Sequence, residues 1–318
     1  MTEPHDILVL QTSDLPAQAE AALRARFELV RIPDDAAARQ TLLADRGGTV
    51  RALAGSGKGR VDRALLAALP QLEIISVTSA GLDAIDTVAV GARGIPIFNT
   101  SSILADDVAD LALWLVLATT RSLVAADRFV RQGRWSKDAQ FPLGKTIAGM
   151  KIGILGLGHI GKAIARRLDV LGAEVGYTGR SRQEGVDRPY FADLTEMARW
   201  CELLVVSCPA TAETRHMVDA AVLDALGADG IVVNIARGTI IDEQALVAAL
   251  TAERLFAAGL DVFEDEPHVP LELRESPRAV LLPHIGSATE GTRARMWQGM
   301  VEALIGHFGL PAHDWSAR

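Results

Sequence analysis

The chain contains few cysteines and few aromatic residues. Cys201 and Cys208 are the only cysteines in 318 residues, and neither has the spacing or the neighbours of a metal site. We therefore expect two buried free thiols in a reducing compartment, with no disulfide framework and no metal centre. Aromatic residues make up 5% of a composition that is 49% hydrophobic, so the predicted cores are mainly aliphatic.

An excess of positive charge and a long apolar run are also missing. The net charge is −8, which argues against sequence-independent binding to nucleic acid or to acidic membranes. The most apolar run, from Leu111 to Ala118, is far shorter than the roughly 18 residues of a membrane span. The first residues, MTEPHDILVLQ, do not resemble a signal peptide. We expect a cytoplasmic protein that binds neither nucleic acid nor a membrane.

Short β-branched runs alternate with Ala- and Leu-rich helical patterns along the whole chain. This alternation is typical of α/β folds with parallel sheets, and the length favours two domains. Strands are predicted at 7–10, 28–32, 50–54, 72–77 and 95–98, and in a second series at 151–156, 174–179, 202–208, 230–236, 256–263 and 279–285. A last helix is predicted over roughly 289–308.

Residues 102–135 carry a helical pattern between the two series of strands. Asp106 and Asp107 lie in its first turn, where the helix dipole favours negative charge. The middle of the segment is apolar almost all round, which indicates burial in a large core or against a second subunit. The sequence predicts one long helix here, followed by a loop over 135–150.

A glycine motif follows the first strand of the second series, at a predicted strand-turn-helix junction. It reads Gly156-Leu157-Gly158-His159-Ile160-Gly161. In this context Gly156 permits a tight turn, Gly158 lets a pyrophosphate approach the backbone, and Gly161 lets helix and strand pack closely. The motif predicts a dinucleotide-binding site.

The next predicted strand indicates which dinucleotide is bound. A ribose with a free 2′-hydroxyl is usually held by an acidic residue at this strand end, but here the chain runs into Gly179-Arg180-Ser181-Arg182. Two guanidinium groups and a hydroxyl suit a 2′-phosphate. We expect NADPH to be preferred; the alternative is a solvated basic turn that also accepts NADH.

Three polar residues follow neighbouring predicted strands and are expected to meet at one sheet edge. Arg237 would bind a substrate carboxylate, His284 would act as general acid, and Glu266 would accept a hydrogen bond from the other imidazole nitrogen. These are the partners that reduction of a 2-oxo acid requires. Each residue also has a structural interpretation, as a surface cation, a loop acid and a satisfied histidine.

Several segments together resemble the D-isomer-specific 2-hydroxyacid dehydrogenases, especially the glyoxylate/hydroxypyruvate reductase branch and the related hydroxyphenylpyruvate reductases. The segments that carry the resemblance are TSAGLDAID (78–86), DDVADLALWLVLATTR (106–121), GILGLGHIGKAIARRL (153–168), NIARGTIIDEQAL (234–246), AAGLDVFEDEP (257–267) and LLPHIGSAT (281–289). The resemblance implies two doubly wound parallel-sheet domains. A Rossmann-type cofactor domain (101–286) would be inserted in a flavodoxin-like substrate domain (1–100 plus 287–318).

The resemblance also implies functional residues. It implies the same catalytic set, with Arg237 and His284 also contacting substrate. Substrate carboxylate would be held by backbone amides of Ser79-Ala80-Gly81, where the family usually has Gly-Val-Gly. Residues expected to line the cofactor, besides the glycine motif and 179–182, are Cys208, Pro209, Thr214, Ile235, Ala236, Asp261, Gly286 and Ser287.

Family members are typically homodimers joined through the cofactor domain, which would use the helix at 102–135. Trp135 would then either anchor this arm or approach the neighbouring subunit's active site. The expected activity is reduction of glyoxylate or hydroxypyruvate with NADPH. The alternatives are an arylpyruvate such as hydroxyphenylpyruvate, a sugar-derived 2-oxo acid, and, from another class, a non-enzymatic dinucleotide sensor.

Overall fold

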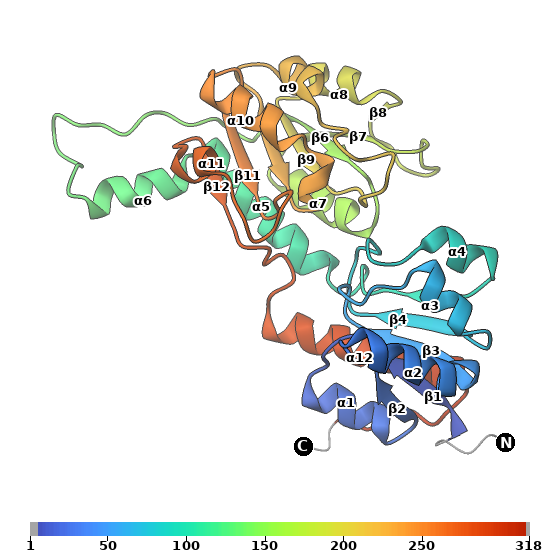
Figure 1. Cartoon of the computed structure of the whole chain (residues 1–318). Helices are drawn as coiled ribbons and strands as arrows, with labels where there is room; N and C mark the ends of the chain where they lie inside the picture. The colour runs from blue at the N-terminus through green and yellow to red at the C-terminus, as the bar shows by residue number, and fades with distance from the viewer. Residues whose placement is uncertain (1–5, 316–318) are drawn as a thin grey trace. The chain divides into compact units, whose positions relative to one another are not determined.

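The computed structural model describes residues 6–315 and divides the chain into two compact units. Unit 1 comprises Met1–Leu104 and Thr289–Arg318, and unit 2 comprises Ala105–Ala288. Each unit contains one parallel sheet with helices packed on it (Figure 1). The fold is therefore α/β with two parallel-sheet domains, as the sequence predicts.

The sheet of unit 1 has five parallel strands in the order β2-β1-β3-β4-β5. This is the flavodoxin-like order. Its strands are β1 (Leu8–Gln11), β2 (Glu28–Arg31), β3 (Val50–Gly55), β4 (Ile74–Val77) and β5 (Ile97–Phe98), and its helices are α1 (Ala17–Arg24), α2 (Ala36–Arg46), α3 (Arg63–Ala68), α4 (Thr87–Ala92) and α12 (Glu290–His307).

Helix α12 joins unit 1 although it follows all of unit 2 in the sequence. Its buried face presents Met300, Val301 and Leu304 to a core that includes Ile7 and Val9 of the first strand region. Burial of such a side chain contributes about 1.5–3 kcal/mol, so this face helps to hold the returning chain on the sheet.

The sheet of unit 2 has seven parallel strands in the order β12-β11-β10-β9-β6-β7-β8. Counted from β6, six of them follow the Rossmann order 3-2-1-4-5-6, and β12 extends that sheet. The strands are β6 (Lys151–Leu155), β7 (Glu174–Thr178), β8 (Tyr190–Phe191), β9 (Leu203–Val206), β10 (Ile231–Asn234), β11 (Ala257–Leu260) and β12 (Ala279–Leu281), and the helices are α5 (Ala105–Thr120), α6 (Leu123–Arg131), α7 (His159–Val170), α8 (Leu194–Trp200), α9 (Ala220–Leu226), α10 (Glu243–Thr251) and α11 (Leu271–Glu275).

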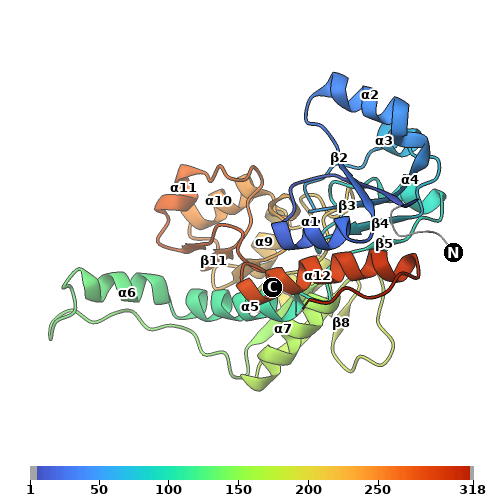
Figure 2. The same cartoon turned by 90° about the horizontal axis from the view of Figure 1, so that it is seen from below.

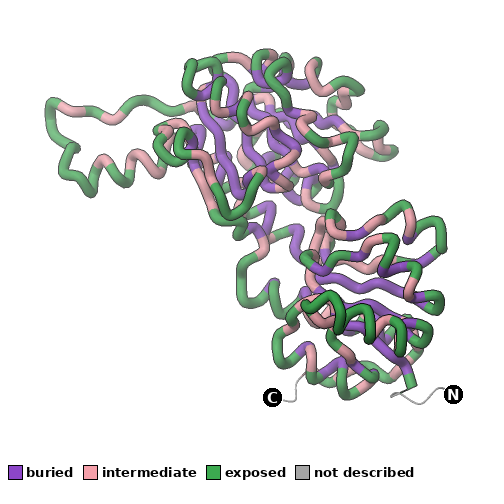
Figure 3. Tube along the Cα trace, viewed as in Figure 1, coloured by how far each residue is buried: buried purple, intermediate pink, exposed green. Residues whose placement is uncertain are grey.

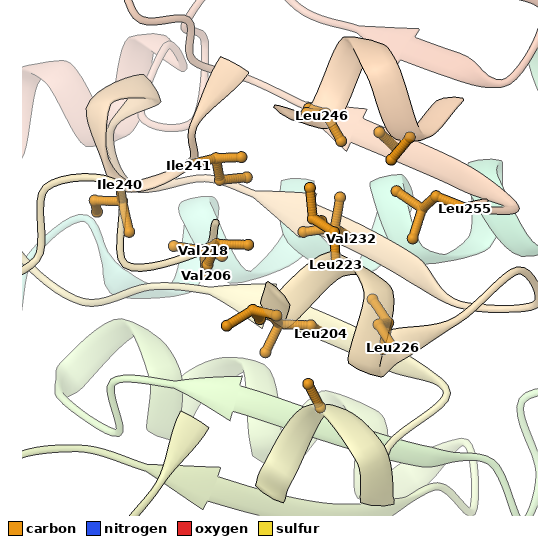
Figure 4. Close-up of a cluster of buried hydrophobic side chains, with 14 of the residues drawn as sticks. Leu204, Val206, Val218, Leu223, Leu226, Val232, Ile240, Ile241, Leu246 and Leu255 are labelled. Atoms are coloured by element: carbon orange, nitrogen blue, oxygen red, sulfur yellow. The ribbon is translucent and has the colours of Figure 1, made fainter. Parts of the chain in front are cut away.

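The central strands of unit 2 are fully buried, which explains their runs of aliphatic residues. Every residue of β9 and of β10 is buried, and Figure 3 shows buried segments running along both sheets. Figure 4 shows part of the core, where Leu204 and Val232 of these strands face Leu223 of α9 and Leu246 of α10. This rigid core fixes the strand ends that carry the candidate site.

The prediction of a single helix over 102–135 is wrong. Two helices, α5 and α6, are bent by 63° at a break where Ser122 adopts a left-handed φ of 50°. The Thr120 carbonyl accepts a hydrogen bond from Lys145 N at 2.8 Å. Within residues 6–315 no single helix is long and apolar enough to cross a membrane, and only this bent pair taken together meets that length and composition.

The two helices also differ in burial. Much of α5 is buried inside unit 2 itself, including Ala109, Ala112 and Leu115, so its apolar surface belongs to the core of its own domain. No residue of α6 is buried. Helix α6 and the segment after it project from the rest of unit 2 (Figures 1 and 2). We call residues 121–144 the arm.

The two-residue strand β8 is absent from the sequence prediction. It pairs only through Tyr190 with Tyr177 and Phe191 with Thr178. So short a run carries no detectable alternation, and its position depends on a neighbouring strand.

Candidate active site

The glycine turn lies between β6 and α7, beside β9, where the strand order reverses. Gly156 has φ +97°, and a Cβ there would come within 2.6 Å of the Cys208 backbone. A Cβ on Gly161 would lie 2.2 Å from the Gly156 carbonyl oxygen, whereas a Cβ on Gly158 meets nothing within 4 Å. The first and last glycines therefore allow close packing, and the middle one leaves open space beside the backbone.

The N-terminus of α7 is suited to an anion. Gly158 is its N-cap residue and provides no side-chain hydrogen bond, while α8, α9 and α10 each begin with an aspartate whose carboxylate accepts a backbone N–H. The first N–H groups of a helix need such acceptors. Uncapped N–H groups next to open space fit the pyrophosphate of a dinucleotide.

The loop after β7 presents positive charge to solvent. Arg180, Ser181 and Arg182 are exposed, and neither arginine forms an ion pair or hydrogen bond with another residue in the range 6–315. Gln183 fixes this loop to the glycine turn because its Nε2 donates to the Leu157 carbonyl at 2.8 Å. Charged side chains with unused donors are thus held next to the glycine turn.

The loop after β9 carries Cys208, Pro209 and Thr214. The Thr214 hydroxyl donates to the Pro209 carbonyl at 2.9 Å, which folds the loop on itself. Burial raises the pKa of the Cys208 thiol to about 12 and that of Cys201 to about 12. Both cysteines are free and buried, as the sequence predicts, and both thiols are protonated at neutral pH.

Arg237 follows β10 in a turn that is held by a buried amide. Asn234 is 1% exposed; its Nδ2 donates to the Arg237 carbonyl at 2.8 Å and its Oδ1 accepts from Ala236 N at 3.0 Å. Ile235 is buried and Ala236 half-buried within the same turn. The turn therefore presents Arg237 at the carboxyl end of the strand.

Glu266 and His284 meet, although they follow different strands. Glu266 Oε2 lies 2.7 Å from His284 Nδ1, and Glu266 Oε1 accepts a hydrogen bond from Phe263 N at 3.1 Å. The contact fixes the imidazole ring and leaves Nε2 as the ring nitrogen outside this contact. His284 adopts a left-handed φ of 55°, which is unfavourable for a residue with a Cβ.

Asp261 holds the segment that follows His284. Its carboxylate oxygens accept hydrogen bonds from Ile285 N and Gly286 N, both at 2.8 Å. Burial raises the pKa of this carboxyl above its usual range, and the two N–H groups oppose that shift. Asp261 is 1% exposed, and its carboxylate contacts the His284 segment. Ser287 follows in the same segment and is half-buried.

The predicted substrate loop lies in unit 1, after β4. The Ser79 hydroxyl donates to the Gly81 carbonyl at 2.7 Å, which closes the loop around Ala80. A Cβ on Gly57 would come within 2.5 Å of the Ser79 Cβ, so the loops after β3 and β4 are in close contact. The sequence-predicted residues of this unit thus form one compact loop pair.

The structure adds residues that sequence reasoning missed or assigned differently. Asn234 and Gln183 hold the Arg237 turn and the Arg180 loop, and Asp261 holds the His284 segment. A buried polar residue at a strand end is a signal for Asn234, but the partners of all three come from tertiary contacts. In unit 2 the arrangement provides a helix end suited to an anion, a cation and a paired imidazole at one sheet edge.

Comparison with known proteins agrees with this geometry. A sequence model of the D-isomer specific 2-hydroxyacid dehydrogenase NAD-binding domain matches residues 113–286. The chain is 43% identical to glyoxylate/hydroxypyruvate reductase A of Arabidopsis thaliana (94% of this chain, 95% of the relative). It is 41% identical to hydroxyphenylpyruvate reductase of Plectranthus scutellarioides (94% and 95%).

A solved structure is similar over nearly the whole chain. It is an NADPH-dependent glyoxylate/hydroxypyruvate reductase from Sinorhizobium meliloti in complex with NADP and malonate. The TM-score is 0.84 at 40% identity, covering 95% of this chain and 94% of the other. The similarity spans both units.

Proposed function

Because the chain belongs to the D-isomer specific 2-hydroxyacid dehydrogenase family, we propose that it reduces a small 2-oxo acid, glyoxylate or hydroxypyruvate first, with NADPH. The observation that carries this proposal is the 2.7 Å contact between Glu266 and His284 on the sheet edge that also carries the glycine turn. The products are glycolate and D-glycerate.

The catalytic roles follow from the side chains. Arg237 binds the substrate carboxylate through its planar guanidinium and so orients the carbonyl carbon. His284 donates a proton from Nε2 to the carbonyl oxygen as the alkoxide forms. Glu266 keeps the ring oriented and stabilises the imidazolium form. When bound, the reduced nicotinamide supplies the hydride.

The cofactor preference is proposed from the loop after β7. Arg180, Ser181 and Arg182 would hold the 2′-phosphate, and the backbone of Gly156 to Gly161 would hold the pyrophosphate. Support comes from the exposed guanidinium groups and from the NADP complex of the Sinorhizobium meliloti relative. NADH would be the weaker cofactor. The loops with Cys208, Pro209, Thr214, Ile235, Ala236, Asp261, Gly286 and Ser287 would line the rest of the dinucleotide.

The substrate side chain would be selected by unit 1, in which Ser79-Ala80-Gly81 offers backbone amides to the carboxylate. A second candidate substrate is hydroxyphenylpyruvate, because a hydroxyphenylpyruvate reductase is 41% identical to this chain.

We also propose a homodimer that buries the arm. Leu123, Val130, Trp135 and Leu143 of the arm are exposed, Leu143 by 98%. Apolar surface of this kind is typical of an oligomer interface. Trp135 would anchor the arm on the second copy or approach that copy's active site. A reducing, cytoplasmic compartment fits the two free thiols.

The test is oxidation of NADPH and, in parallel, NADH by the purified protein with glyoxylate, hydroxypyruvate, pyruvate, phenylpyruvate and hydroxyphenylpyruvate. The proposal predicts the highest kcat/KM with NADPH and the two smallest polar acids. Higher kcat/KM for hydroxyphenylpyruvate would select the second candidate. Absence of turnover with every acid, while NADPH still binds, would refute the reductase proposal and favour a dinucleotide sensor.

A further inference from the structure

The loop that carries Glu266 is held by a second cluster of charged side chains. Glu264 Oε1 lies 2.8 Å from His216 Nε2 and 2.8 Å from Arg215 Nη2. The side chain of Glu264 is 26% exposed, so water screens this contact only in part. His216 and Arg215 lie in the loop after β9, and the cluster therefore joins that loop to the loop after β11.

The main chain of Glu264 is held from a third direction. Its N–H donates to Glu243 Oε2 at 3.2 Å, at the start of α10. Burial raises the pKa of the Glu243 carboxyl, and the charges of Glu264 and Asp265 act in the same direction. Glu243 thus lies where ionisation of its carboxyl is unfavourable, and this carboxyl holds the backbone of Glu264 by the hydrogen bond.

The segment Phe263–Glu264 contacts both catalytic turns. A Cβ on Gly238, next to Arg237, would lie 1.9 Å from the Phe263 carbonyl carbon, so the two backbones are in direct contact. The Phe263 N–H donates to Glu266 Oε1 at 3.1 Å. A displacement of this segment would therefore move the turn of Arg237 and the carboxylate of Glu266 together.

His216 itself occupies an unfavourable conformation. Its φ is 51°, in the left-handed region, which is unfavourable for a residue with a Cβ. Its N–H donates to the Thr239 carbonyl at 2.9 Å, in the turn after Arg237. Such a conformation persists where the surrounding contacts favour it, and the contact with Glu264 is one of them.

We propose that Glu264, clamped by His216 and Arg215, is a positioning residue that keeps the Glu266 carboxylate on His284. Glu264 acts through the Phe263–Glu266 segment and takes no part in the reaction itself. The kinetic consequence of this inference rests on the proposed function. Its structural consequence, the position of the Glu266 carboxylate, does not.

Two pairs of variants separate the clamp from general stability. Glu264→Ala removes the acceptor, whereas Glu264→Gln keeps an oxygen at the same reach. His216→Ala removes the donor, whereas His216→Gln keeps a donor. Both variants of His216 have a Cβ at the same φ. Glu253→Ala is the control, because Glu253 forms an ion pair with Arg278 at 3.1 Å near the amino ends of β11 and β12.

With hydroxypyruvate and NADPH, both alanine variants are expected to lower kcat about 10-fold or more, since small misplacements of catalytic groups are costly. The Kd for NADPH, measured by fluorescence, should change less than about 3-fold, and both glutamine variants should recover most of kcat. A kcat for Glu264→Ala equal to that of Glu253→Ala would overturn the proposal, as would a parallel loss of NADPH binding.

The crystal structure of Glu264→Ala decides the matter without any turnover. The wild-type protein has 2.7 Å between Glu266 Oε2 and His284 Nδ1. The proposal predicts that this hydrogen bond is broken in the variant, and an unchanged contact would overturn it. If Glu264→Ala does not fold, the His216→Ala crystal is read in the same way. A wild-type protein that is inactive on every oxo acid refutes the proposed function alone.

Discussion

The carboxyl edges of the two sheets differ in chemistry although both sheets are parallel and doubly wound. In unit 2 this edge holds hydrogen-bonded charged groups. Glu266 contacts His284, and Asp261 accepts a hydrogen bond from Ile285 N, the residue after His284. In unit 1 it holds glycines and hydroxyls, with Ser13 Oγ accepting from Ser56 N at 2.7 Å and Ser79 bonded within its own loop.

Under the proposed function, this difference would correspond to a division of labour between the two units. Groups that move or stabilise a proton need fixed hydrogen-bonded partners, and the contact of Glu266 with His284 at the unit 2 edge is of this kind. Under the proposed function, the shape and the backbone amides of the closely packed unit 1 loops would select the substrate. We therefore expect changes in unit 2 to act mainly on kcat or cofactor binding, and changes in unit 1 to act mainly on KM.

The largest effect is expected from His284→Ala and Arg237→Ala. Loss of the positioned acid or of the carboxylate clamp should lower kcat/KM for hydroxypyruvate by about 10² or more. Steady-state rates with saturating NADPH provide the measurement, and unchanged thermal unfolding is the control. Near-normal rates in both variants would show that the reaction does not depend on these residues at the unit 2 edge.

Arg180→Ala separates cofactor binding from proton transfer within unit 2, because it alters the proposed 2′-phosphate contact and leaves the general acid His284 in place. A hydrogen bond to a charged group contributes about 1.5–3 kcal/mol, so KM for NADPH should rise about 10-fold or more while KM for NADH stays the same. Arg199→Ala, an exposed arginine on α8, is the matched control. An unchanged preference between the two cofactors would eliminate the 2′-phosphate contact.

Gly57→Ala tests unit 1. The added Cβ would lie 2.5 Å from the Ser79 Cβ and displace the substrate loop. We expect KM for glyoxylate to rise about 5-fold with kcat nearly unchanged. Gly91→Ala, on α4 with nothing within 4 Å of the new Cβ, is the control. A loss of kcat without a change in KM would contradict the division of labour.

The smallest effect concerns stability. The pKa of Glu243 is raised above its ordinary value of 4.5 by burial, so its ionised form destabilises the fold at neutral pH. Glu243→Gln keeps an oxygen for the Glu264 N–H and should unfold at higher urea concentration than wild type at neutral pH. The gain should shrink as the pH falls through the folded pKa, because the wild-type carboxyl then becomes neutral. A gain that grows on acidification would contradict this.

Much of the site could be predicted because it depends on local geometry. Glycines at 156, 158 and 161 imply a tight turn because they lie between a predicted strand and a predicted helix, and the strand ends of a parallel sheet bring Arg237, Glu266 and His284 to one edge. The predicted contact of Glu266 with the imidazole is present in the structure.

What could not be predicted depends on contacts between distant residues. The break after α5 coincides with the hydrogen bond from Lys145 to Thr120, which no local pattern reveals. Asp261 contacts the His284 segment, 24 and 25 residues further along the chain. The partners of Glu264 lie on other loops in the same way, so the residue reads as an ordinary loop acid in the sequence.

The most direct test of the account is the configuration of the product from hydroxypyruvate. Purified protein is incubated with NADPH and hydroxypyruvate, and the glycerate formed is separated on a chiral column. The account predicts D-glycerate, formed in amounts equal to the NADPH consumed and lost in His284→Ala. Formation of L-glycerate, or NADPH binding with no glycerate at all, would contradict it.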